Sequence, residues 1–255
     1  MSRVRATALL AVLLLAVAGC AASPSTGAPP PNRTVTVFAA SSLTGVFGEL
    51  GKRFEAEHPG VTVRFSFESS ATLAEQIAQG APADVFAAAS PTTMATVTDA
   101  GLAPTDPPVF VRNRLQIAVP KGNPGHVHEL TDLTRPELKV ALCAEQVPCG
   151  AATVKALRIA GLKVTPDTYE KDVKAVLSKL TLGEVDAALV YHSDVVAAGD
   201  KVEGIDFAEA EQAINDYPIA VLNDAPQKSL AEQFVALVRS ATGREALAKA
   251  GFELP

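Results

Sequence analysis

The sequence has little aromatic or imidazole character. It contains no tryptophan, three tyrosines and four histidines, and aromatic residues make up 5% of the chain. It therefore lacks the aromatic residues interleaved with basic ones that many nucleic-acid-binding surfaces carry. The 22 basic side chains face 28 acidic ones, and without Arg3 and Arg5 the balance is 20 against 28, a net charge of −8. A polyanionic partner such as nucleic acid is not expected.

Common catalytic motifs are also missing. The sequence has no G-x-S-x-G nucleophile elbow, no P-loop and no G-x-G-x-x-G. "HVH" at 126–128 is compatible with two metal ligands, but it follows a "KGNPG" turn, and a solvated loop is favoured. His192, after Tyr191 at a strand end, is the only histidine we place near a cleft. A serine hydrolase would have to use it as its base, with no orienting partner placed by a motif.

Only three cysteines are present, and two of them lie close together. Cys143 and Cys149 bracket "CAEQVPC". In an exported protein such a pair favours a disulfide, which would add roughly 2 kcal/mol of stability for so short a loop. A metal site is the alternative, but no histidine lies within ten residues of either cysteine.

The third cysteine, Cys20, ends an export signal. Two arginines precede an apolar run of thirteen residues, Ala6 to Ala18, which is too short for a usual transmembrane helix. "VAGC" then resembles a lipoprotein box, so residues 1–19 are expected to be a signal peptide and Cys20 to be lipidated. An ordinary cleaved signal with an incidental cysteine is the alternative. Residues 20–33, rich in Pro, Ser and Gly, are predicted to form a tether to the outer face of the cell membrane.

From about residue 34 the chain alternates between strand and helix patterns. Strands are predicted at 35–40, 61–67, 84–89, 139–142 and 185–190. Helices are predicted at 43–57, 72–79, 91–100, 151–160, 170–182, 193–198, 229–240 and 243–250. This alternation is typical of α/β folds with parallel-type sheets covered on both faces.

Two longer extended stretches, Pro108–Pro120 and Asp216–Asn223, interrupt the alternation. They predict two lobes joined by two crossings. The first lobe would comprise 34–113 plus 219–255, and the second 114–218.

Two neighbouring predicted strands end in a serine pair before a helix, at Ser41–Ser42 and Ser69–Ser70. Serine is a common N-cap, so each pair alone predicts only a well-capped helix. Parallel strands, however, end on one edge of the sheet, where ligands bind in this class of fold. Helix N-termini and hydroxyls supply neutral donors for a small oxyanion there. The two interpretations remain open at this point.

Five segments carry a family resemblance over nearly the whole chain from Val35. They are "VTVFAASSLTGVFGEL", "SFESSATLAEQIAQGAPADVFAAA", "VPCGAATVKAL", "EKDVKAVLSKLTLGEVDAALVYHSDV" and "YPIAVL". Together they resemble bacterial molybdate-binding proteins, the extracytoplasmic solute receptors of molybdate ABC importers. The resemblance implies a two-lobed periplasmic-binding-protein fold (type II, mixed sheets) and no enzymatic activity.

Carried over by position, the resemblance implies an oxyanion held by neutral groups, with no direct ligand to the metal atom. The hydroxyls would come from Ser42, Ser70 and Tyr191, and backbone contacts from Cys149 and Val173. Two positions depart from the family: Ser41 often is Ala, and Cys149 often is a smaller residue. A backbone N–H still serves at Cys149, and a disulfide to Cys143 would brace the loop that presents it.

The resemblance further implies that the ligand is molybdate or tungstate, that no cofactor is needed, and that the protein is a monomer delivering its ligand to an ABC permease. A donor-only cage disfavours phosphate, which carries a proton at neutral pH. Sulfate or another tetrahedral oxyanion is the alternative ligand, and an anchored serine hydrolase the alternative of another class. Asp84, Glu170, Asp172 and Asp194 lie close to these positions in the sequence, yet no lysine or arginine occupies an implied contact.

Overall fold

The computed structural model describes residues 33–255. The predicted signal peptide (1–19), Cys20 and the tether up to Asn32 lie outside the described residues. No helix within 33–255 is long and apolar enough to cross a membrane. The α-helices are α1 (Thr44–Glu57), α2 (Ser70–Ala78), α3 (Pro91–Asp99), α4 (Pro148–Ala160), α5 (Val173–Thr181), α6 (His192–Ala198), α7 (Lys228–Arg239) and α8 (Ala241–Lys249). Short 3₁₀ helices are η1 (Ser41–Leu43), η2 (Leu130–Thr134), η3 (Gly199–Lys201) and η4 (Ala208–Gln212).

Ten strands form two five-stranded sheets. The first sheet has the order β2-β1-β3-β10-β4, and the second has the order β7-β6-β8-β5-β9. The strands are β1 (Arg33–Ala40), β2 (Val61–Glu68), β3 (Val85–Ala87), β4 (Val109–Asn113), β5 (Leu115–Pro120), β6 (Val140–Cys143), β7 (Thr168–Glu170), β8 (Ala187–Tyr191), β9 (Val202–Ile205) and β10 (Asn215–Val221). We call each sheet with its helices a lobe. The α/β fold of the two-lobed type is confirmed.

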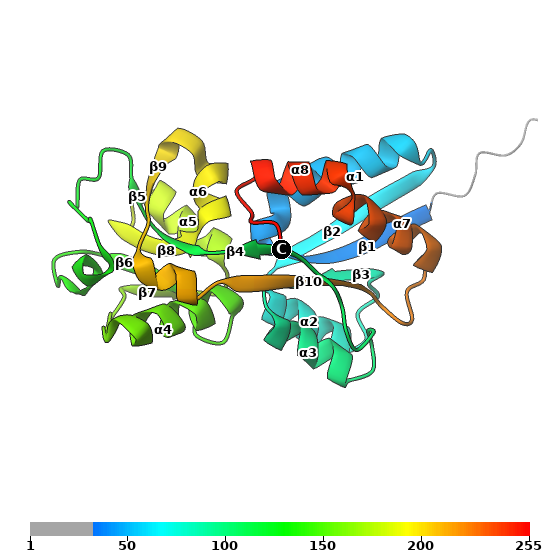
Figure 1. Ribbon diagram of the computed structural model, residues 1–255, viewed down its shortest axis with the longest axis horizontal. Helices are drawn as coiled ribbons and strands as arrows, with labels where there is room; N and C mark the ends of the chain where they lie inside the picture. The colour runs from blue at the N-terminus through cyan, green and yellow to red at the C-terminus, as the bar shows by residue number, and fades with distance from the viewer. Residues whose placement is uncertain (1–32) are drawn as a thin grey trace, which may run out of the picture. The chain divides into compact units, whose positions relative to one another are not determined.

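Helices cover both faces of the first sheet: α1, α7 and α8 lie on one side, and α2 and α3 on the other (Figure 1). Side chains alternate along β1, so that Val35 and Val37 pack with α1 and α7 while Phe38 packs with α2 and α3. In the second sheet, Ala141 packs with α5 and Leu142 with η2. Each lobe therefore has a core on both faces of its sheet.

Local signals in the sequence explain several helix ends. The side chains of Ser69, Ser90 and Asp172 each accept a hydrogen bond from an amide in the first turn of α2, α3 and α5. Proline occupies the first position of α3 and α4, where no amide hydrogen is required. Gly161 ends α4 at a φ of 66°, a conformation that favours glycine.

The sheets are mixed rather than purely parallel. Strands β1, β2 and β3 are parallel, but β10 runs antiparallel to β3 and β4, and β5 runs antiparallel to β8 and β9. Strands β7 and β9 were not predicted from the sequence, because three and four residues give too little periodicity. The predicted helix at 170–182 begins only at Val173, since Glu170 pairs with Cys143 in the second sheet.

Two crossings connect the lobes. Only Arg114 separates β4 in the first sheet from β5 in the second. The return crossing follows η4 and enters β10, which pairs with β4 from Asn215 onwards. The sequence placed this change of lobe at Pro218, but Pro218 lies inside β10, at a register shift that interrupts the alternation.

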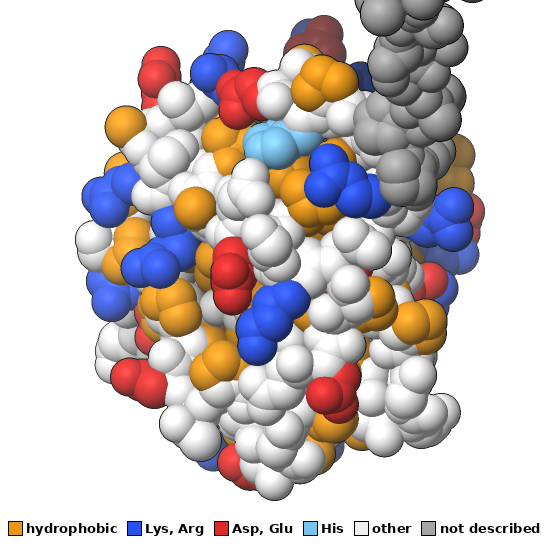
Figure 2. All heavy atoms as spheres, turned by 90° about the vertical axis from the view of Figure 1, so that its right-hand side faces the viewer, with side chains coloured by type: hydrophobic (Ala, Val, Ile, Leu, Met, Phe, Trp, Pro, Cys, Tyr) orange, Lys and Arg blue, Asp and Glu red, His pale blue; other side chains and the backbone are white. Residues whose placement is uncertain are grey.

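Figure 2 shows the end of the molecule formed by the first lobe. Basic and acidic side chains are interspersed on this face, and hydrophobic side chains appear as small separate patches. On the part of this face that the structure describes, the mixed charge offers a polyanion no continuous basic surface.

Candidate functional site

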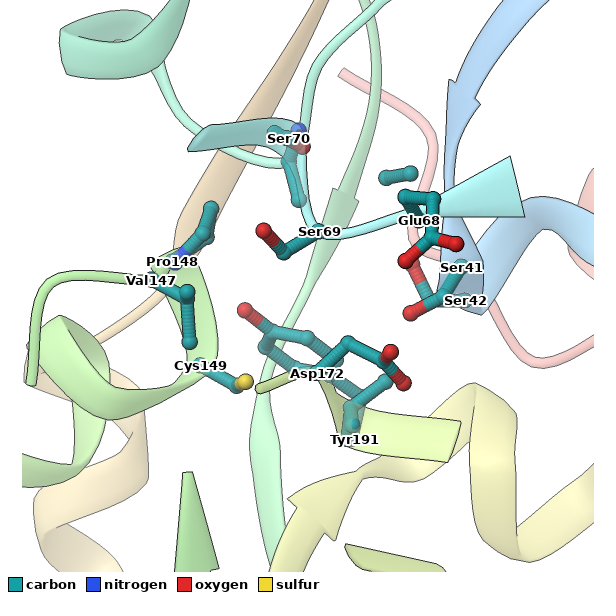
Figure 3. A pocket seen from close by; sticks show the side chains of 13 residues that line it. Ser41, Ser42, Glu68, Ser69, Ser70, Val147, Pro148, Cys149, Asp172 and Tyr191 are labelled. Carbon is teal, nitrogen blue, oxygen red and sulfur yellow. Dashed lines mark hydrogen bonds between the residues drawn. The ribbon is translucent and has the colours of Figure 1, made fainter. Parts of the chain in front are cut away.

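A small pocket lies between the two sheets, where β1 and β2 of one lobe and β8 of the other end (Figure 3). The space that the centre of a water molecule can occupy in it has a volume of about 10 Å³. Both lobes contribute to its walls. The lining residues are Ala40, Ser41, Ser42, Glu68, Ser69, Ser70, Ala89, Val147, Pro148, Cys149, Asp172, Val173 and Tyr191. All five contacts implied by the family resemblance are among them: Ser42, Ser70, Cys149, Val173 and Tyr191.

The first serine pair follows β1 directly, in η1 before α1. Both Ser41 and Ser42 are buried. The Ser42 hydroxyl lies 3.0 Å from the hydroxyl of Tyr217, a residue of β10. The Ser41 carbonyl accepts a hydrogen bond from the Thr44 hydroxyl, which closes the turn into α1. Ser42 is therefore held by a phenol from a different part of the chain.

The second serine pair divides its roles. Ser69 caps α2, since its hydroxyl accepts the Thr72 amide at 3.1 Å. The Ser70 hydroxyl accepts the Ala89 amide at 2.8 Å, so its own hydrogen remains available to a ligand. Figure 3 shows the Ser69 hydroxyl facing the same space as the Tyr191 hydroxyl, so Ser69 also borders the pocket.

The opposite wall begins at the N-terminus of α4. Cys143 and Cys149 form a disulfide across the turn between β6 and α4, as the spacing favoured. Gly150 makes this turn possible, because a Cβ there would lie 1.8 Å from the Ala144 carbonyl oxygen. Since Pro148 has no amide hydrogen, Cys149 provides the first N–H of the helix, and helix geometry leaves that group without an intrahelical partner.

A third helix N-terminus, that of α5, completes this wall. Asp172 caps the helix by accepting the Ala175 amide at 3.0 Å, and Val173 follows it. Three helices of at least nine residues, α2, α4 and α5, thus begin at the pocket. Their N-termini combine free amide donors with positive dipole ends, an arrangement that stabilises an anion.

Tyr191 ends β8 and is 1% exposed. Its hydroxyl accepts a hydrogen bond from the Asn215 side chain at 2.9 Å. Burial, followed by the nearby Tyr217 and Asp194, raises the pKa of Tyr191 well above its ordinary value. The phenol therefore stays protonated and able to donate throughout the neutral range.

Asp194 holds the second wall together from behind. It is fully buried, accepts the Tyr191 amide at 3.1 Å and pairs with Lys174 at 2.9 Å. Burial raises the pKa of Asp194, and the Lys174 ammonium opposes that shift. Through these contacts Asp194 joins the end of β8 to the first turn of α5.

No lysine or arginine lines the pocket, but two carboxylates do, those of Glu68 and Asp172. Asp172 is occupied as a helix cap. Glu68 pairs at 3.1 Å with Lys171 of the other lobe, and this hydrogen bond raises the pKa of Lys171. The negative charge at the rim is thus neutralised across the cleft.

Three acidic residues close to the site in the sequence do not line the pocket. Asp84 accepts the amides of Thr36 and Gln227 and lines no part of the pocket, so its role is to join β1, β3 and the start of α7. Glu170 and Asp194 are also outside the lining. Asp194 nevertheless supports the wall from behind through the Tyr191 amide. Closeness in the sequence does not fix the direction of a side chain.

The histidines offer no catalytic base at the serines. His192 is outside the lining of the pocket, and its Nδ1 lies 3.3 Å from Gln116 Oε1. His126 and His128 are exposed on the loop between β5 and η2. Among the described residues, no group of three or more His, Cys, Asp and Glu side chains is placed to hold a metal ion.

Sequence reasoning missed Asn215 and Tyr217, which support Tyr191 and Ser42 from β10. The available signal was weak: "NDYPIAV" reads as an extended crossing, and only the pairing of β10 with β4 turns these side chains toward the pocket.

A family model of bacterial extracellular solute-binding proteins matches residues 35–253. The chain belongs to this family. Solute-binding proteins serve transport by binding, so the protein is a binding protein and not an enzyme.

Two relatives of this chain match it over most of their length. The chain is 42% identical to the molybdate-binding protein ModA of Mycobacterium tuberculosis, over 98% of this chain and 97% of the relative. It is 34% identical to a Bacillus subtilis protein provisionally named an ABC transporter substrate-binding lipoprotein, over 96% and 95%.

Two solved structures share the fold of this solute-binding protein. The periplasmic molybdate-binding protein of Azotobacter vinelandii aligns with a TM-score of 0.76 at 20% identity, covering 87% of this chain and 99% of that one. The sulfate-binding protein SubI of Mycobacterium tuberculosis aligns with a TM-score of 0.76 at 18% identity, covering 87% of each. At these identities the likeness concerns the fold alone.

Proposed function

We propose that the protein binds molybdate, or the similar tungstate, in the pocket between its lobes. The observation that carries the proposal is the set of neutral donors, with three helix N-termini and the hydroxyls of Ser42, Ser70 and Tyr191 around one small cavity. The 42% identity to a molybdate-binding protein over nearly the whole chain supports the choice of ligand.

The size of the cavity favours a compact anion. A volume of about 10 Å³ leaves no room for a sugar or a peptide between the walls as they stand, and even a tetrahedral oxyanion requires a small outward movement of the walls. A tetrahedral oxyanion can direct its oxygens at donors on both walls. Neutral donors suffice because the charge is balanced by helix dipoles and charge-assisted hydrogen bonds.

Sulfate is the second candidate. It is also a tetrahedral dianion, and a sulfate-binding protein has the same fold. Calorimetric titration of anion-free protein with molybdate, tungstate, sulfate and phosphate decides between them. Molybdate and tungstate are expected to bind at least a hundredfold more tightly than sulfate, a difference of about 2.7 kcal/mol. Sulfate binding of equal strength would contradict the proposed choice.

We further propose that the protein acts as a monomer outside the cytoplasm, anchored by lipid on Cys20, and delivers its ligand to an ABC permease. The name of the Bacillus subtilis relative and the "VAGC" box support the anchor. Cys20→Ser should move the protein from the membrane fraction to the soluble exported fraction. Unchanged partitioning of this variant on cell fractionation would refute the lipid anchor.

A further inference from the structure

Asn215 lies at the point where the chain returns to the first lobe. It is the first residue of β10, it is 8% exposed, and it does not line the pocket itself. Its side-chain nitrogen Nδ2 lies 2.7 Å from the carbonyl oxygen of Ala89, 2.9 Å from the Tyr191 hydroxyl and 3.4 Å from the carbonyl oxygen of Pro148. One amide therefore contacts both lobes directly behind the pocket.

The surroundings fix which end of this amide faces Tyr191. A carbonyl oxygen only accepts hydrogen bonds, so the group facing Ala89 and Pro148 must be the NH₂ of Asn215. With one N–H directed at Ala89, the other is directed at the Tyr191 oxygen. The phenol consequently accepts from Asn215, and its single proton remains to be donated elsewhere. Figure 3 shows the Tyr191 hydroxyl pointing into the pocket.

The Ser70 hydroxyl is oriented in the same way. It accepts the amide of Ala89, the residue whose carbonyl accepts from Asn215. The two hydroxyls from opposite lobes are thus each supplied with an N–H donor, and each has its own proton left to donate. For Tyr191 the neighbouring Tyr217 hydroxyl is the competing acceptor when no anion is bound. The contacts of Asn113, the partner of Asn215 in β4, differ. Its nitrogen Nδ2 lies near the hydroxyls of Ser193 and Tyr217. Because a hydroxyl can either donate or accept, these contacts do not fix which end of the Asn113 amide faces them.

We propose that Asn215 is a positioning residue that makes Tyr191 a fixed hydrogen-bond donor toward the bound anion and so selects fully deprotonated oxyanions. This inference rests on the proposed function. An anion that carries a proton, such as hydrogen phosphate, needs an acceptor, and the Tyr191 oxygen already accepts from Asn215. The two carboxylates of the lining are also engaged, Asp172 by the Ala175 amide and Glu68 by Lys171. Because Asn215 belongs to β10 of the first lobe and Tyr191 to the second, the donor is aligned only when the lobes are together.

Two substitutions at Asn215 separate direction from packing. Asn215→Asp replaces the NH₂ by an oxygen that only accepts, so it should draw the Tyr191 proton away from the pocket. At pH 8 we expect a loss of molybdate affinity of about a hundredfold or more. The affinity should recover toward pH 6, because burial raises the pKa of such a carboxyl and its protonated form again donates to Tyr191. Asn215→Leu should lower the affinity for molybdate by about tenfold or less, and this loss should not depend on pH. The same variant should show a smaller ratio of molybdate affinity to phosphate affinity than the wild type.

Asn223→Asp is the matched control. Asn223 is exposed and donates to the Gly101 carbonyl away from the pocket, so this variant adds the same charge without touching Tyr191. It should bind molybdate like the wild type at both pH values. Equal, pH-independent affinities for Asn215→Asp and Asn215→Leu would overturn the proposal, and so would unchanged affinity in both.

A spectroscopic measurement on ligand-free protein tests the same contact. The Raman ring doublet of tyrosine reports whether the phenol accepts or donates, and a Tyr191→Phe difference spectrum isolates this residue from Tyr169 and Tyr217. Wild type should show an accepting phenol, Asn215→Leu should lose that signature, and Asn215→Asp should show a donating phenol. Identical spectra would overturn the proposal even if molybdate binds. Since this measurement needs no ligand, it separates a failure of the Asn215 contact from a failure of the proposed function.

Discussion

At the scale of single residues, the pocket is defined by what its hydroxyls already contact. Ser69 accepts a helix amide, Ser70 accepts the Ala89 amide, and Ser42 lies beside Tyr217. Similar residues in similar sequence positions therefore have different partners. A serine that caps a helix contributes mainly to stability, whereas one whose proton remains free can contribute to binding.

Substitution of the serines separates these roles. Ser42→Ala and Ser70→Ala should each weaken molybdate binding roughly ten- to hundredfold, because each removes a charge-assisted hydrogen bond worth about 1.5–3 kcal/mol. Ser69→Ala should instead cost about 1 kcal/mol of unfolding free energy as a lost N-cap, with a smaller change in affinity. Titration calorimetry and ligand-free melting of all three variants provide the comparison. Wild-type affinity in both Ser42→Ala and Ser70→Ala would leave these serines with structural roles only.

Alkaline pH tests the buried phenols. Burial raises the pKa of both Tyr191 and Tyr217, so molybdate affinity should stay level between about pH 7 and pH 9.5. In the unfolded chain the same phenols ionise near the ordinary value of 10.0, which lies below their folded values. Their contribution to stability is therefore complete below pH 10 and is lost as the pH rises through the folded values.

Urea unfolding at pH 8, 10 and 11 measures this loss. Tyr191→Phe should show a shallower decline, since one of the two raised phenols is gone. A fall in molybdate affinity that begins between pH 7 and pH 9 would contradict raised pKa values for these tyrosines.

At the scale of elements, the turn between β6 and α4 is the most constrained part of the site. The disulfide spans it, and Gly150 lies so close to the Ala144 carbonyl that no side chain fits. Both features hold the first turn of α4, and with it the Cys149 amide, against the pocket. The element is thus built to present backbone donors.

Two variants perturb this turn independently. Replacing Cys143 and Cys149 together by serine should lower the unfolding free energy by roughly 2 kcal/mol and weaken molybdate binding, because the turn is no longer tied. Gly150→Ala keeps the disulfide but forces the turn away from the helix, so it should weaken binding as well. Gly45→Ala, at a glycine of α1 with no neighbour within 4 Å of the added Cβ, is the control and should bind normally. Normal binding in both turn variants would show that the Cys149 amide is not required.

At the scale of the whole molecule, the arrangement of lobes leaves the pocket residues little exposed. Ser42, Ser70, Cys149, Val173 and Tyr191 are each 7% exposed or less. Lys171 of the second lobe pairs with Glu68 of the first at the rim, and Asn215 joins both lobes behind the cavity. An anion has little access to these groups in this arrangement, so we expect its entry to involve hinge motion at the crossings.

Small-angle scattering should detect this motion. Anion-free protein is expected to be more open, and molybdate should reduce its radius of gyration. Phosphate at equal ionic strength is the control and should leave the profile unchanged. If molybdate binds but the profiles with and without it coincide, a large closure is excluded and the anion must enter by a local movement.

The sequence alone determined the α/β fold class and most helix positions, it favoured the disulfide, and the family resemblance implied the five residues that line the pocket. The fold class and the helix positions follow from short-range signals: hydrophobic periodicity, serine and aspartate caps, and prolines at helix starts. The five residues follow only from the resemblance. The contacts of those five residues with an anion remain predictions.

Only the tertiary structure decided the support behind the site. It paired β10 with β4, turned Asn215 and Tyr217 toward Tyr191 and Ser42, and placed Asp84 away from the cleft. It also brought Lys171 to Glu68 from the other lobe. These contacts join residues up to 175 positions apart in the chain. Local sequence patterns carry no information at such separations, because the direction of a side chain depends on strand pairing and register, which the packing of the complete sheets sets.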